Sequence, residues 1–316
     1  MLNIIIPLYK GKDVIKDCLN SLCAQTKKNF FITIIQDNDN EDYSEIINEY
    51  KNKLHICFLQ NKENIGAGMT RQRGIDVSDK FDYVMFLDSD DMLNPRAVEL
   101  LYTYSKSNFS DVTISKIIVE KKYTRGNVLS LDKTDTWLHG KIYRTNYLKD
   151  NNISFFPEIR YNEDVCFNLL ALNLSDKIYY LDEELYIWRD NVNSVTRKDI
   201  FSFVKESTWQ YLYGYAKSLL ILLEKNKLNK NKISSALMSL YTQSQVLIEC
   251  NGVSKDENIF ISKFLNNHII KEALLDKKVL NSIVNNNKIG YTIGKEPIIF
   301  HESFDNWVNR IKGVIK

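Results

Sequence analysis

Four short apolar runs in the first 90 residues constrain the fold of this chain most strongly. Amphipathic segments with helical spacing separate them, at about 14–22, 43–51 and 65–77. Runs that are apolar throughout, alternating with such segments, are typical of parallel strands covered on both faces by crossover helices. The pattern predicts an α/β fold with a doubly wound sheet. The four runs are "LNIIIPL" at 2–8, "FFITIIQ" at 30–36, "LHICFL" at 54–59 and "DYVMFL" at 82–87.

The alternation weakens after about residue 110 and gives way to helical patterns after about residue 200. We therefore divide the chain into an α/β domain at 1–197 and a C-terminal helical subdomain at 198–316. In the first part, "DVTISKIIVE" and "KIYYLDEELYIW" predict strands, and "NEDVCFNLLALN" predicts a capped helix. Helical patterns in the second part cover 201–227, 234–249, 267–284 and 303–316.

The composition excludes several classes of protein. The formal net charge of the 316 residues is only +2, and Lys and Arg are spread along the chain. A nucleic-acid binder would show a concentrated basic face, so we expect no nucleic-acid partner. The five cysteines lack metal-binding spacing and predict reduced thiols in the cytoplasm. The initial apolar stretch is too short for a signal sequence, and no segment approaches the roughly 18 apolar residues that cross a bilayer.

The stretch "MFLDSDDML" places Asp88, Asp90 and Asp91 directly after an apolar run. Ligands of open parallel sheets bind outside the carboxyl ends of the strands. Asp88 and Asp90 are separated by one residue, so in an extended segment they project to the same side. Two carboxylates there suit Mg²⁺ or Mn²⁺, which also bind phosphate oxygens. The alternative is a solvated acidic turn before a helix, with Asn94 as its cap and Pro95 at its first position.

Four stretches occur together in an order that is similar to one enzyme family. They are "IIIPLYKGKDVIKDCLNSLCAQT", "FFITIIQDNDNED", "NKENIGAGMTRQRGID" and "YVMFLDSDDMLNP". Together they resemble the nucleotide-binding half of family-2 glycosyltransferases of the GT-A fold. The resemblance is close over about 1–120 and extends to about 197 through "GKIYR", "NEDVCFN" and "LYIWRDNVNSVTR". It implies a Rossmann-like, mixed and mostly parallel sheet, with a nucleotide half at 1–120 and an acceptor half at 121–197.

The resemblance implies a binding site for a UDP-sugar donor at the start of the chain. Pro7, Leu8 and Tyr9 match the end of the first strand, which forms the floor beneath the uracil base. For Tyr9, ordinary partial burial is the alternative. Asp37 matches the residue that accepts a hydrogen bond from uracil N3–H or from the ribose. The chain departs from the family at this point, because "QDND" replaces the usual Asp-Asp-Gly-Ser.

Further donor contacts are implied after the third strand and at the acidic motif. Gly66 and Arg71 match the segment beneath the base and the phosphates, with Arg73 as the alternative to Arg71. Asp88, Ser89 and Asp90 match the metal motif. In that motif Asp88 lies nearer the ribose, and Asp90 binds the Mn²⁺ or Mg²⁺ that bridges the diphosphate.

The resemblance also places the catalytic base in "NEDVCFN". Asp164 matches the general base of the acceptor site, and Glu163 matches the residue that orients it or contacts the acceptor. Both residues have a structural alternative, because acidic side chains in a first helical turn are favoured by about 0.3–1 kcal/mol through the helix dipole. The same dipole lowers a carboxylate pKa, which weakens a base.

The segments on either side of this helix supply acceptor candidates. Trp137 and Trp188 have the flat apolar surface that stacks on a sugar ring, although burial is an equal alternative. His139 is a candidate ligand of the ion or contact of the acceptor, and a lone His is more often neither. Arg189 begins a polar stretch that suits a diphosphate or an acceptor lid; Ser194 and Arg197 continue it.

The helical C-terminal part carries no catalytic motif. Its aromatic density around 207–223 predicts helix packing, with a homodimer interface as an alternative use. The last helix, "FDNWVNRIKGVIK", places Phe304, Trp307, Val308, Ile311 and Val314 on one face. That face is compatible with peripheral contact to the inner membrane face, and core packing is the simpler use.

These observations predict an inverting, metal-dependent glycosyltransferase that moves a hexosyl or N-acetylhexosaminyl group from a UDP-sugar to a hydroxyl of a glycan, lipid-linked or protein-linked acceptor. A divalent ion at the acidic motif neutralises the leaving diphosphate. The first alternative is a catalytically inactive module that binds sugar nucleotides or glycans. The second is a metal-dependent phosphohydrolase, in which DxD usually follows the first strand and not the fourth.

Overall fold

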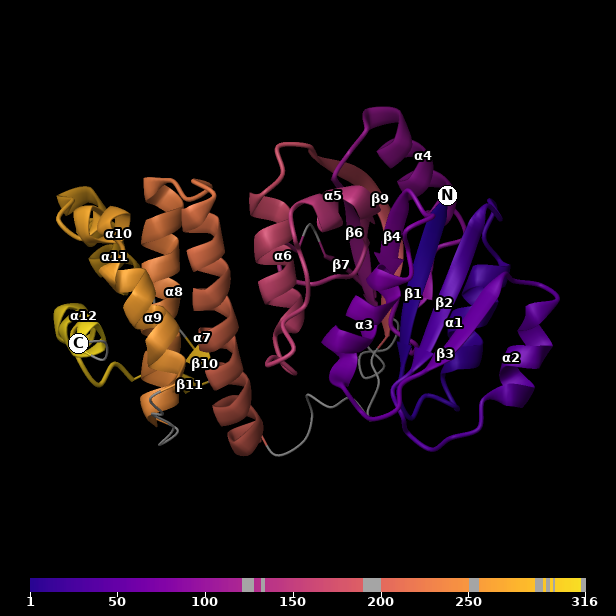
Figure 1. Cartoon of the computed structure of the whole chain (residues 1–316), viewed down its shortest axis with the longest axis horizontal. Helices are drawn as coiled ribbons and strands as arrows, with labels where there is room; N and C mark the ends of the chain where they lie inside the picture. Colours follow the sequence, from indigo (N-terminus) through magenta and orange to yellow (C-terminus); the bar gives the residue numbers. More distant parts are fainter. Residues whose placement is uncertain are drawn as a thin grey trace. The chain divides into compact units, whose positions relative to one another are not determined.

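The computed structural model describes two compact units, which we treat separately (Figure 1). Unit 1 comprises Met1–Arg160 and Phe167–Asn193, and unit 2 comprises Tyr161–Cys166 and Ser194–Lys316. The boundary that we predicted at residue 197 lies outside the described residues, as do Ser194 and Arg197. The residues described are 1–120, 128–131, 134–189, 200–249, 256–287, 292–293, 296–297 and 299–313.

The first half of unit 1 is the predicted alternation of parallel strands and helices. Strands β3, β2, β1 and β4 lie side by side in this order, all parallel, so the α/β prediction is confirmed. In β1 both faces are buried, because helices cover the sheet on either side. The elements are β1 (Leu2–Leu8), α1 (Ile15–Cys23), β2 (Phe30–Gln36), α2 (Ser44–Lys51), β3 (Ile56–Gln60), α3 (Gly66–Asp76) and β4 (Tyr83–Phe86).

Beyond β4 the sheet becomes mixed. Strand β8 (Lys141–Arg144) pairs antiparallel with β4 and with β6 (Val112–Glu120), and β9 (Ile178–Arg189) runs parallel to β6. The last strand on this side, β5 (Met92–Leu93), pairs antiparallel with the end of β9. The sequence pattern missed β5 and β8, which are too short for a periodicity to be recognised. The remaining elements are α4 (Ala97–Asn108), β7 (Val128–Leu131), α5 (Thr145–Asp150) and α6 (Glu163–Asn173), of which Glu163–Cys166 belong to unit 2.

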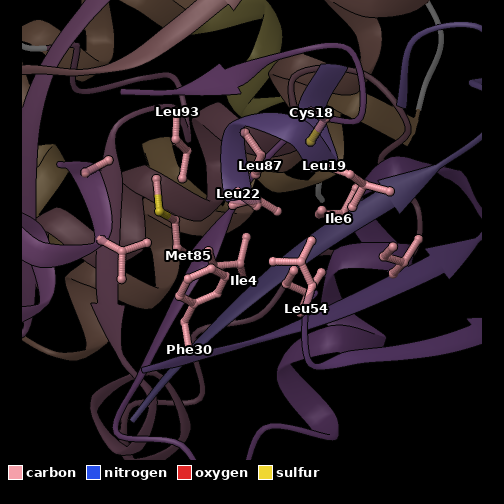
Figure 2. Close-up of a cluster of buried hydrophobic side chains, with 14 of the residues drawn as sticks. Ile4, Ile6, Cys18, Leu19, Leu22, Phe30, Leu54, Met85, Leu87 and Leu93 are labelled. Atoms are coloured by element: carbon pink, nitrogen blue, oxygen red, sulfur yellow. The ribbon is translucent and has the colours of Figure 1, made fainter. Parts of the chain in front are cut away.

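Two apolar layers, one on each face of the sheet, hold unit 1 together. On one face Ile4 and Ile6 of β1 pack with Leu19 and Leu22 of α1 (Figure 2). On the other face, Phe86 of β4 contacts the ring of Phe167 in α6, with 5.7 Å between ring centroids. Full burial of side chains of this size stabilises a fold by roughly 1.5–3 kcal/mol each. The packing therefore fixes β1 and β4, whose carboxyl ends carry the candidate site.

Unit 2 is helical, as predicted. The patterns at 201–227, 234–249 and 303–316 correspond to α7 (Ile200–Glu224), α8 (Lys230–Glu249) and α12 (Phe304–Lys312). The pattern at 267–284 predicted one helix and instead forms α10 (His268–Ala273) and α11 (Lys277–Asn287). The break arises because the Asp276 carboxylate accepts a hydrogen bond from the Lys278 amide and starts a new helix. Helix α9 (Asp256–Asn266) and the short strands β10 (Thr292–Ile293) and β11 (Glu296–Pro297) complete the unit.

The apolar face of α12 is buried within unit 2. Trp307 and Ile311 are completely buried, and the rings of Phe304 and Trp307 both contact Tyr241 of α8. Packing, the simpler use that we predicted, is therefore the use of this face that the structure shows. Membrane contact stays a prediction, and Val314 lies outside the described residues. Among the described residues, no helix is both long and apolar enough to cross a membrane.

Gly74 allows α3 to lie directly on β1, which generates a first prediction. A Cβ at residue 74 would lie 2.3 Å from Cγ2 of Ile5, a stiff, β-branched side chain in the buried strand. We expect Gly74→Ala to destabilise unit 1 by about 1–3 kcal/mol through overpacking. Hydrogen exchange of the β1 amides, followed by mass spectrometry, should become correspondingly faster. Gly313→Ala is the control, because its Cβ would meet no atom closer than 3.5 Å. Unchanged β1 exchange in Gly74→Ala would contradict this packing.

Candidate active site

The three carboxylates of the acidic motif lie in a turn that follows β4. The Asp91 amide donates to the Asp88 carbonyl at 3.0 Å, which closes a four-residue turn before β5 begins. We expected an extended segment with Asp88 and Asp90 on one side. A turn of this kind brings its first and fourth residues together, so the structure places Asp88 beside Asp91. Asp90 is half-buried in the turn, and its role as a metal ligand stays a prediction.

Asp88 is held by two basic side chains from distant parts of unit 1. Arg71 of α3 donates from Nη2 to Oδ1 at 2.6 Å, and His139 Nε2 lies 3.2 Å from Oδ2. Burial acts to raise the pKa of Asp88, but the charge of Arg71 and the contact with His139 outweigh it and hold this pKa well below its usual range. Asp88 therefore stays ionised. The structure thus brings together three residues that the sequence assigned to the site.

Asp91, His139 and Asp88 form a compact group of ligand type. Their candidate ligand atoms all lie within 4.8 Å of one another, and His139 Nε2 is 3.8 Å from Oδ2 of Asp91. The other ring nitrogen, Nδ1 of His139, is buried and has no hydrogen-bond partner among the described residues. Two carboxylates and an imidazole fit a divalent cation such as Mn²⁺. This geometry makes His139 a stronger ligand candidate than its isolated position in the sequence indicated.

Asp91 is the functional candidate that the sequence did not assign. Its side chain is 1% exposed, Tyr186 donates to Oδ2 at 2.6 Å, and the Arg189 amide donates to Oδ1 at 2.8 Å. Burial raises its pKa to about 7; repulsion from Asp88 and Asp90 adds to this, while His139 opposes it. The crowding of three acidic residues was the available signal, but spacing alone favoured the Asp88–Asp90 pair.

A buried lysine holds the loop that carries His139. Lys141 is completely buried, and its ammonium donates to the backbone carbonyls of Thr134 and Trp137. Gly140 adopts a φ of +67°, which favours glycine, and a Cβ there would lie 2.9 Å from the Ser115 hydroxyl. His139 is therefore positioned by backbone constraints immediately after it.

The other acceptor candidates have partners within unit 1. The rings of Trp137 and Trp188 are 6.2 Å apart, and both pack partly buried against the core. Arg189 donates from Nη1 to Asp17 at 2.7 Å and also contacts Glu120. An acceptor contact through this guanidinium would require these ion pairs to break. Stacking of a sugar on either tryptophan stays a prediction.

Asp37 ties the end of β2 to the start of α3. Its carboxylate accepts from the amides of Ile65 and Gly66, each at 2.9 Å, and from Asn61 at 2.8 Å. The residue is 3% exposed, so its main contacts cap the helix that carries Arg71. The predicted contact with uracil or ribose would have to use its remaining acceptor capacity. Gly66 has a φ of +83°, as expected where the backbone turns sharply into a helix.

The end of β1 lies against the acidic motif. Leu8 is completely buried, whereas Tyr9 is 45% exposed and is available to a ligand. A Cβ at Gly11 would lie 2.8 Å from Leu8 Cδ1 and 3.2 Å from the Ser89 hydroxyl, so only glycine permits this close approach. Pro7, half-buried, occupies the last part of the strand. The predicted donor segments therefore meet at one edge of the sheet.

The departure from the usual Asp-Asp-Gly-Ser has a structural explanation. Asn38 and Asn40 have φ values of +51° and +62°, and asparagine tolerates this left-handed region better than most residues. Asp39 accepts hydrogen bonds from the Lys10 amide and, at 2.6 Å, from the Tyr43 hydroxyl. The replaced motif therefore bends the chain after β2, and Asp39 holds the segment that follows β1.

Glu163 and Asp164 lie in the first turn of α6, within unit 2. The Cys166 amide donates to the Asn162 carbonyl, so Asn162 begins the helix as predicted. The Asn162 side chain donates to the Ser207 carbonyl of α7, and the Val165 amide donates to the Asp164 carboxylate at 2.8 Å. Both acidic residues are half-buried. Their catalytic roles stay predictions.

Comparison with known proteins identifies the family. Residues 3–159 match the model of glycosyl transferase family 2. Over 250 residues the chain is 31% identical to poly(ribitol-phosphate) β-N-acetylglucosaminyltransferase TarP of Staphylococcus aureus, covering 73% of this chain and 74% of the relative. The chain belongs to glycosyl transferase family 2. The predicted family resemblance is thereby confirmed.

Two further relatives define how far this similarity extends. Poly(ribitol-phosphate) β-glucosyltransferase of Bacillus spizizenii is 32% identical over 192 residues, which cover 56% of this chain but only 30% of that protein. The crystal structure of S. aureus TarS 1–349 in complex with UDP-GlcNAc superposes with a TM-score of 0.56 at 18% identity, covering 96% of this chain and 97% of that one. At this identity the likeness concerns the fold, and it confirms the predicted GT-A fold of the glycosyltransferase.

The contacts of Asp39 predict a specific pH dependence. Burial acts to raise its pKa, but hydrogen bonds from Tyr43, Gln36 and two backbone amides lower it below the ordinary value of 3.8. A depressed native pKa stabilises the fold above the unfolded-state pKa, and this stability is lost as pH falls through the native pKa. We expect the unfolding free energy of the unchanged protein to fall more steeply below about pH 4 than that of Asp39→Asn.

Urea denaturation at several pH values between about 2 and 6 measures this difference. Asp150→Asn, an exposed residue at the end of α5, makes the same change of charge and serves as the control. Parallel pH profiles for the unchanged protein and Asp39→Asn would contradict the role of this carboxylate.

Proposed function

We propose that this protein is an inverting glycosyltransferase that moves a hexosyl or N-acetylhexosaminyl group from a UDP-sugar to a hydroxyl of a glycan acceptor. The observation that carries the proposal is the group formed by Asp88, Asp91 and His139 at the carboxyl end of β4. It lies where open α/β sheets bind nucleotides. The family membership and the names of the two relatives support glycosyl transfer as the reaction.

The donor diphosphate would bind at this group through a divalent cation. Asp88, Asp91 and His139 supply two carboxylates and an imidazole, and Asp90 is the further ligand that the family motif predicts. A bound Mn²⁺ or Mg²⁺ would act as a Lewis acid that neutralises the leaving UDP. Arg71 keeps Asp88 ionised and oriented, so that the carboxylate is ready to bind a cation without a change of protonation state.

Uracil would lie over the end of β1. Tyr9 is the exposed aromatic ring at this point, and Gly11 lets the same segment approach Ser89 of the acidic motif. Asp37 would contribute to donor binding mainly indirectly, because it caps the first turn of α3. The UDP-GlcNAc named in the TarS complex is the kind of donor that this arrangement suits.

Asp164 is our candidate for the general base. In direct displacement it would accept the proton of the acceptor hydroxyl while the hydroxyl oxygen attacks the anomeric carbon and the diphosphate leaves from the opposite face. This geometry inverts the anomeric configuration, and the transition state is oxocarbenium-like, as in glycoside hydrolysis. Glu163, its neighbour in the same helical turn, would orient Asp164 or bind the acceptor.

The acceptor would be a hydroxyl-rich polymer. Both named relatives act on poly(ribitol-phosphate), so a polyol-phosphate chain is the acceptor class that we propose to test first. Lipid-linked and protein-linked glycans are the further candidates. A cytoplasmic location, membrane contact and dimerisation stay predictions of the sequence.

A titration of UDP tests the donor site. We expect calorimetry to detect UDP binding with Mn²⁺, and at least about tenfold weaker binding with EDTA, because the cation supplies the contact with the diphosphate. Asp90→Ala and His139→Ala should weaken the Mn²⁺-dependent binding similarly. Asp150→Ala, which also removes one carboxylate, should bind as the unchanged protein does. Equal UDP affinity with Mn²⁺ and EDTA would contradict the metal site.

Replacement of Asp164 separates a transferase from the two alternatives. We expect Asp164→Asn to lower turnover about 10²–10⁴-fold, the usual contribution of a general base, with little change in UDP affinity. Asp305→Asn is a matched control, because Asp305 is also an acidic residue in a first helical turn, that of α12. Measured sugar transfer should be normal in the control.

The same assay distinguishes the alternatives. Normal turnover in Asp164→Asn would contradict the assignment of the base. Absence of turnover in the unchanged protein, despite UDP binding, would favour an inactive binding module. Release of inorganic phosphate without any acceptor would favour a phosphohydrolase.

A further inference from the structure

One buried tyrosine contacts Asp88, Asp91 and His139, the three residues that form the candidate cation group. Tyr186 of β9 is completely buried, and its hydroxyl donates to Oδ2 of Asp91 at 2.6 Å. The same hydroxyl accepts a hydrogen bond from the Asp88 amide at 3.2 Å. Its ring stacks on the His139 imidazole, with 4.7 Å between centroids and 25° between planes.

The hydroxyl contact selects one orientation of the Asp91 carboxylate. Tyr186 donates to Oδ2 and the Arg189 amide donates to Oδ1, so both oxygens of this buried group are fixed. Oδ2 is also the oxygen nearest to His139 Nε2. Without the Tyr186 donor, the Arg189 amide would still hold Oδ1, but no hydrogen bond from Tyr186 would fix the direction of Oδ2 toward His139.

The ring contact limits His139 in the same way. The imidazole contacts two aromatic rings: Tyr186 stacks on it, and Trp137 packs at 67° to it with 5.7 Å between ring centroids. These two ring contacts restrict rotation of the imidazole. Its Nε2 therefore remains directed at the two carboxylates.

The backbone of Tyr186 is itself aligned with the acidic turn. In the pairing of β5 with β9, Leu93 is opposite Tyr186, and Met92 is opposite Ile187. Since Asp91 immediately precedes β5, this register brings the tyrosine to the turn without any flexible link. The contacts thus arise from strand pairing and not from a mobile side chain on the surface.

We propose that Tyr186 is a positioning residue for the divalent-cation site, which sets the orientation of Asp91 and His139 before the cation binds. The inference rests on the proposed function, because it assumes that Asp88, Asp91 and His139 hold the cation. Groups that orient metal ligands typically change metal affinity 10–100-fold when they are removed. Tyr186 would act through its hydroxyl on Asp91 and through its ring on His139.

The test is Mn²⁺ affinity without nucleotide, measured from the EPR signal of the free ion. Tyr186→Phe keeps the ring and removes only the hydroxyl. Tyr147→Phe is the matched control, because Tyr147 is also buried and its hydroxyl donates at 2.7 Å to the Ala171 carbonyl. We expect about 10–100-fold weaker Mn²⁺ binding in Tyr186→Phe and less than about a twofold change in Tyr147→Phe.

A second measurement reports the geometry of the site and not its stability. At saturating Co²⁺, the d–d absorption spectrum of Tyr186→Phe should differ from that of the unchanged protein, and the spectrum of Tyr147→Phe should not. Circular dichroism verifies that both variants are folded.

The outcomes separate this inference from the proposed function. Mn²⁺ affinities that agree within about twofold between the two variants, with identical Co²⁺ spectra, would overturn the role of Tyr186 and leave the cation site intact. If the unchanged protein binds no Mn²⁺, the cation site itself is wrong and the positioning role is overturned with it.

Discussion

Repulsion among three carboxylates at the end of a buried strand is the constraint on which the candidate site depends. Asp88, Asp90 and Asp91 occupy three of the four consecutive positions 88–91 that follow β4 closely, and Asp91 is buried. Burial and mutual repulsion raise the Asp91 pKa to about 7, whereas Arg71 and His139 hold the Asp88 pKa low. The two acids therefore differ in electrostatic environment although they close the same turn. The divalent cation that we propose for this site would relieve the repulsion that remains in the turn.

The mixed sheet supplies the groups that balance these charges. Its parallel half brings α3 and Arg71 to the carboxyl end of β4, and Asp37 caps that helix. In its second half, β8 begins shortly after His139 and runs antiparallel to β4. The end of β9 pairs with β5. The site is therefore built where the two halves meet, by elements that the packing on both faces of the sheet makes rigid. Rigidity of this kind is what an electrostatic site requires, because its dipoles and charges must be oriented before the substrate arrives.

Much of this architecture could be predicted from local patterns, and the failures are informative. The apolar runs identified β1, β2, β3 and β4, and "DSDD" was correctly placed after the fourth strand. The short strands β5 and β8 carry no periodicity, so local patterns did not show where the strand direction reverses, although the family resemblance implied a mixed sheet. We expected an extended segment at the acidic motif, with Asp90 on the same side as Asp88. The structure has a turn there, and Asp91 lies beside Asp88 instead. One hydrogen bond between residues three apart was enough to change which carboxylates meet.

The sequence by itself determined the fold class, the family and the segments that carry chemistry, because these depend on periodicity and on motifs within short stretches of chain. Only the tertiary structure decided which side chains meet at Asp88. Arg71 is 17 residues away from it, His139 is 51 and Tyr186 is 98. Contacts over such separations are set by strand pairing and register, and a shift of one residue would turn Tyr186 to the opposite face of the sheet. No local pattern records that choice, since it is made by the packing of the whole sheet.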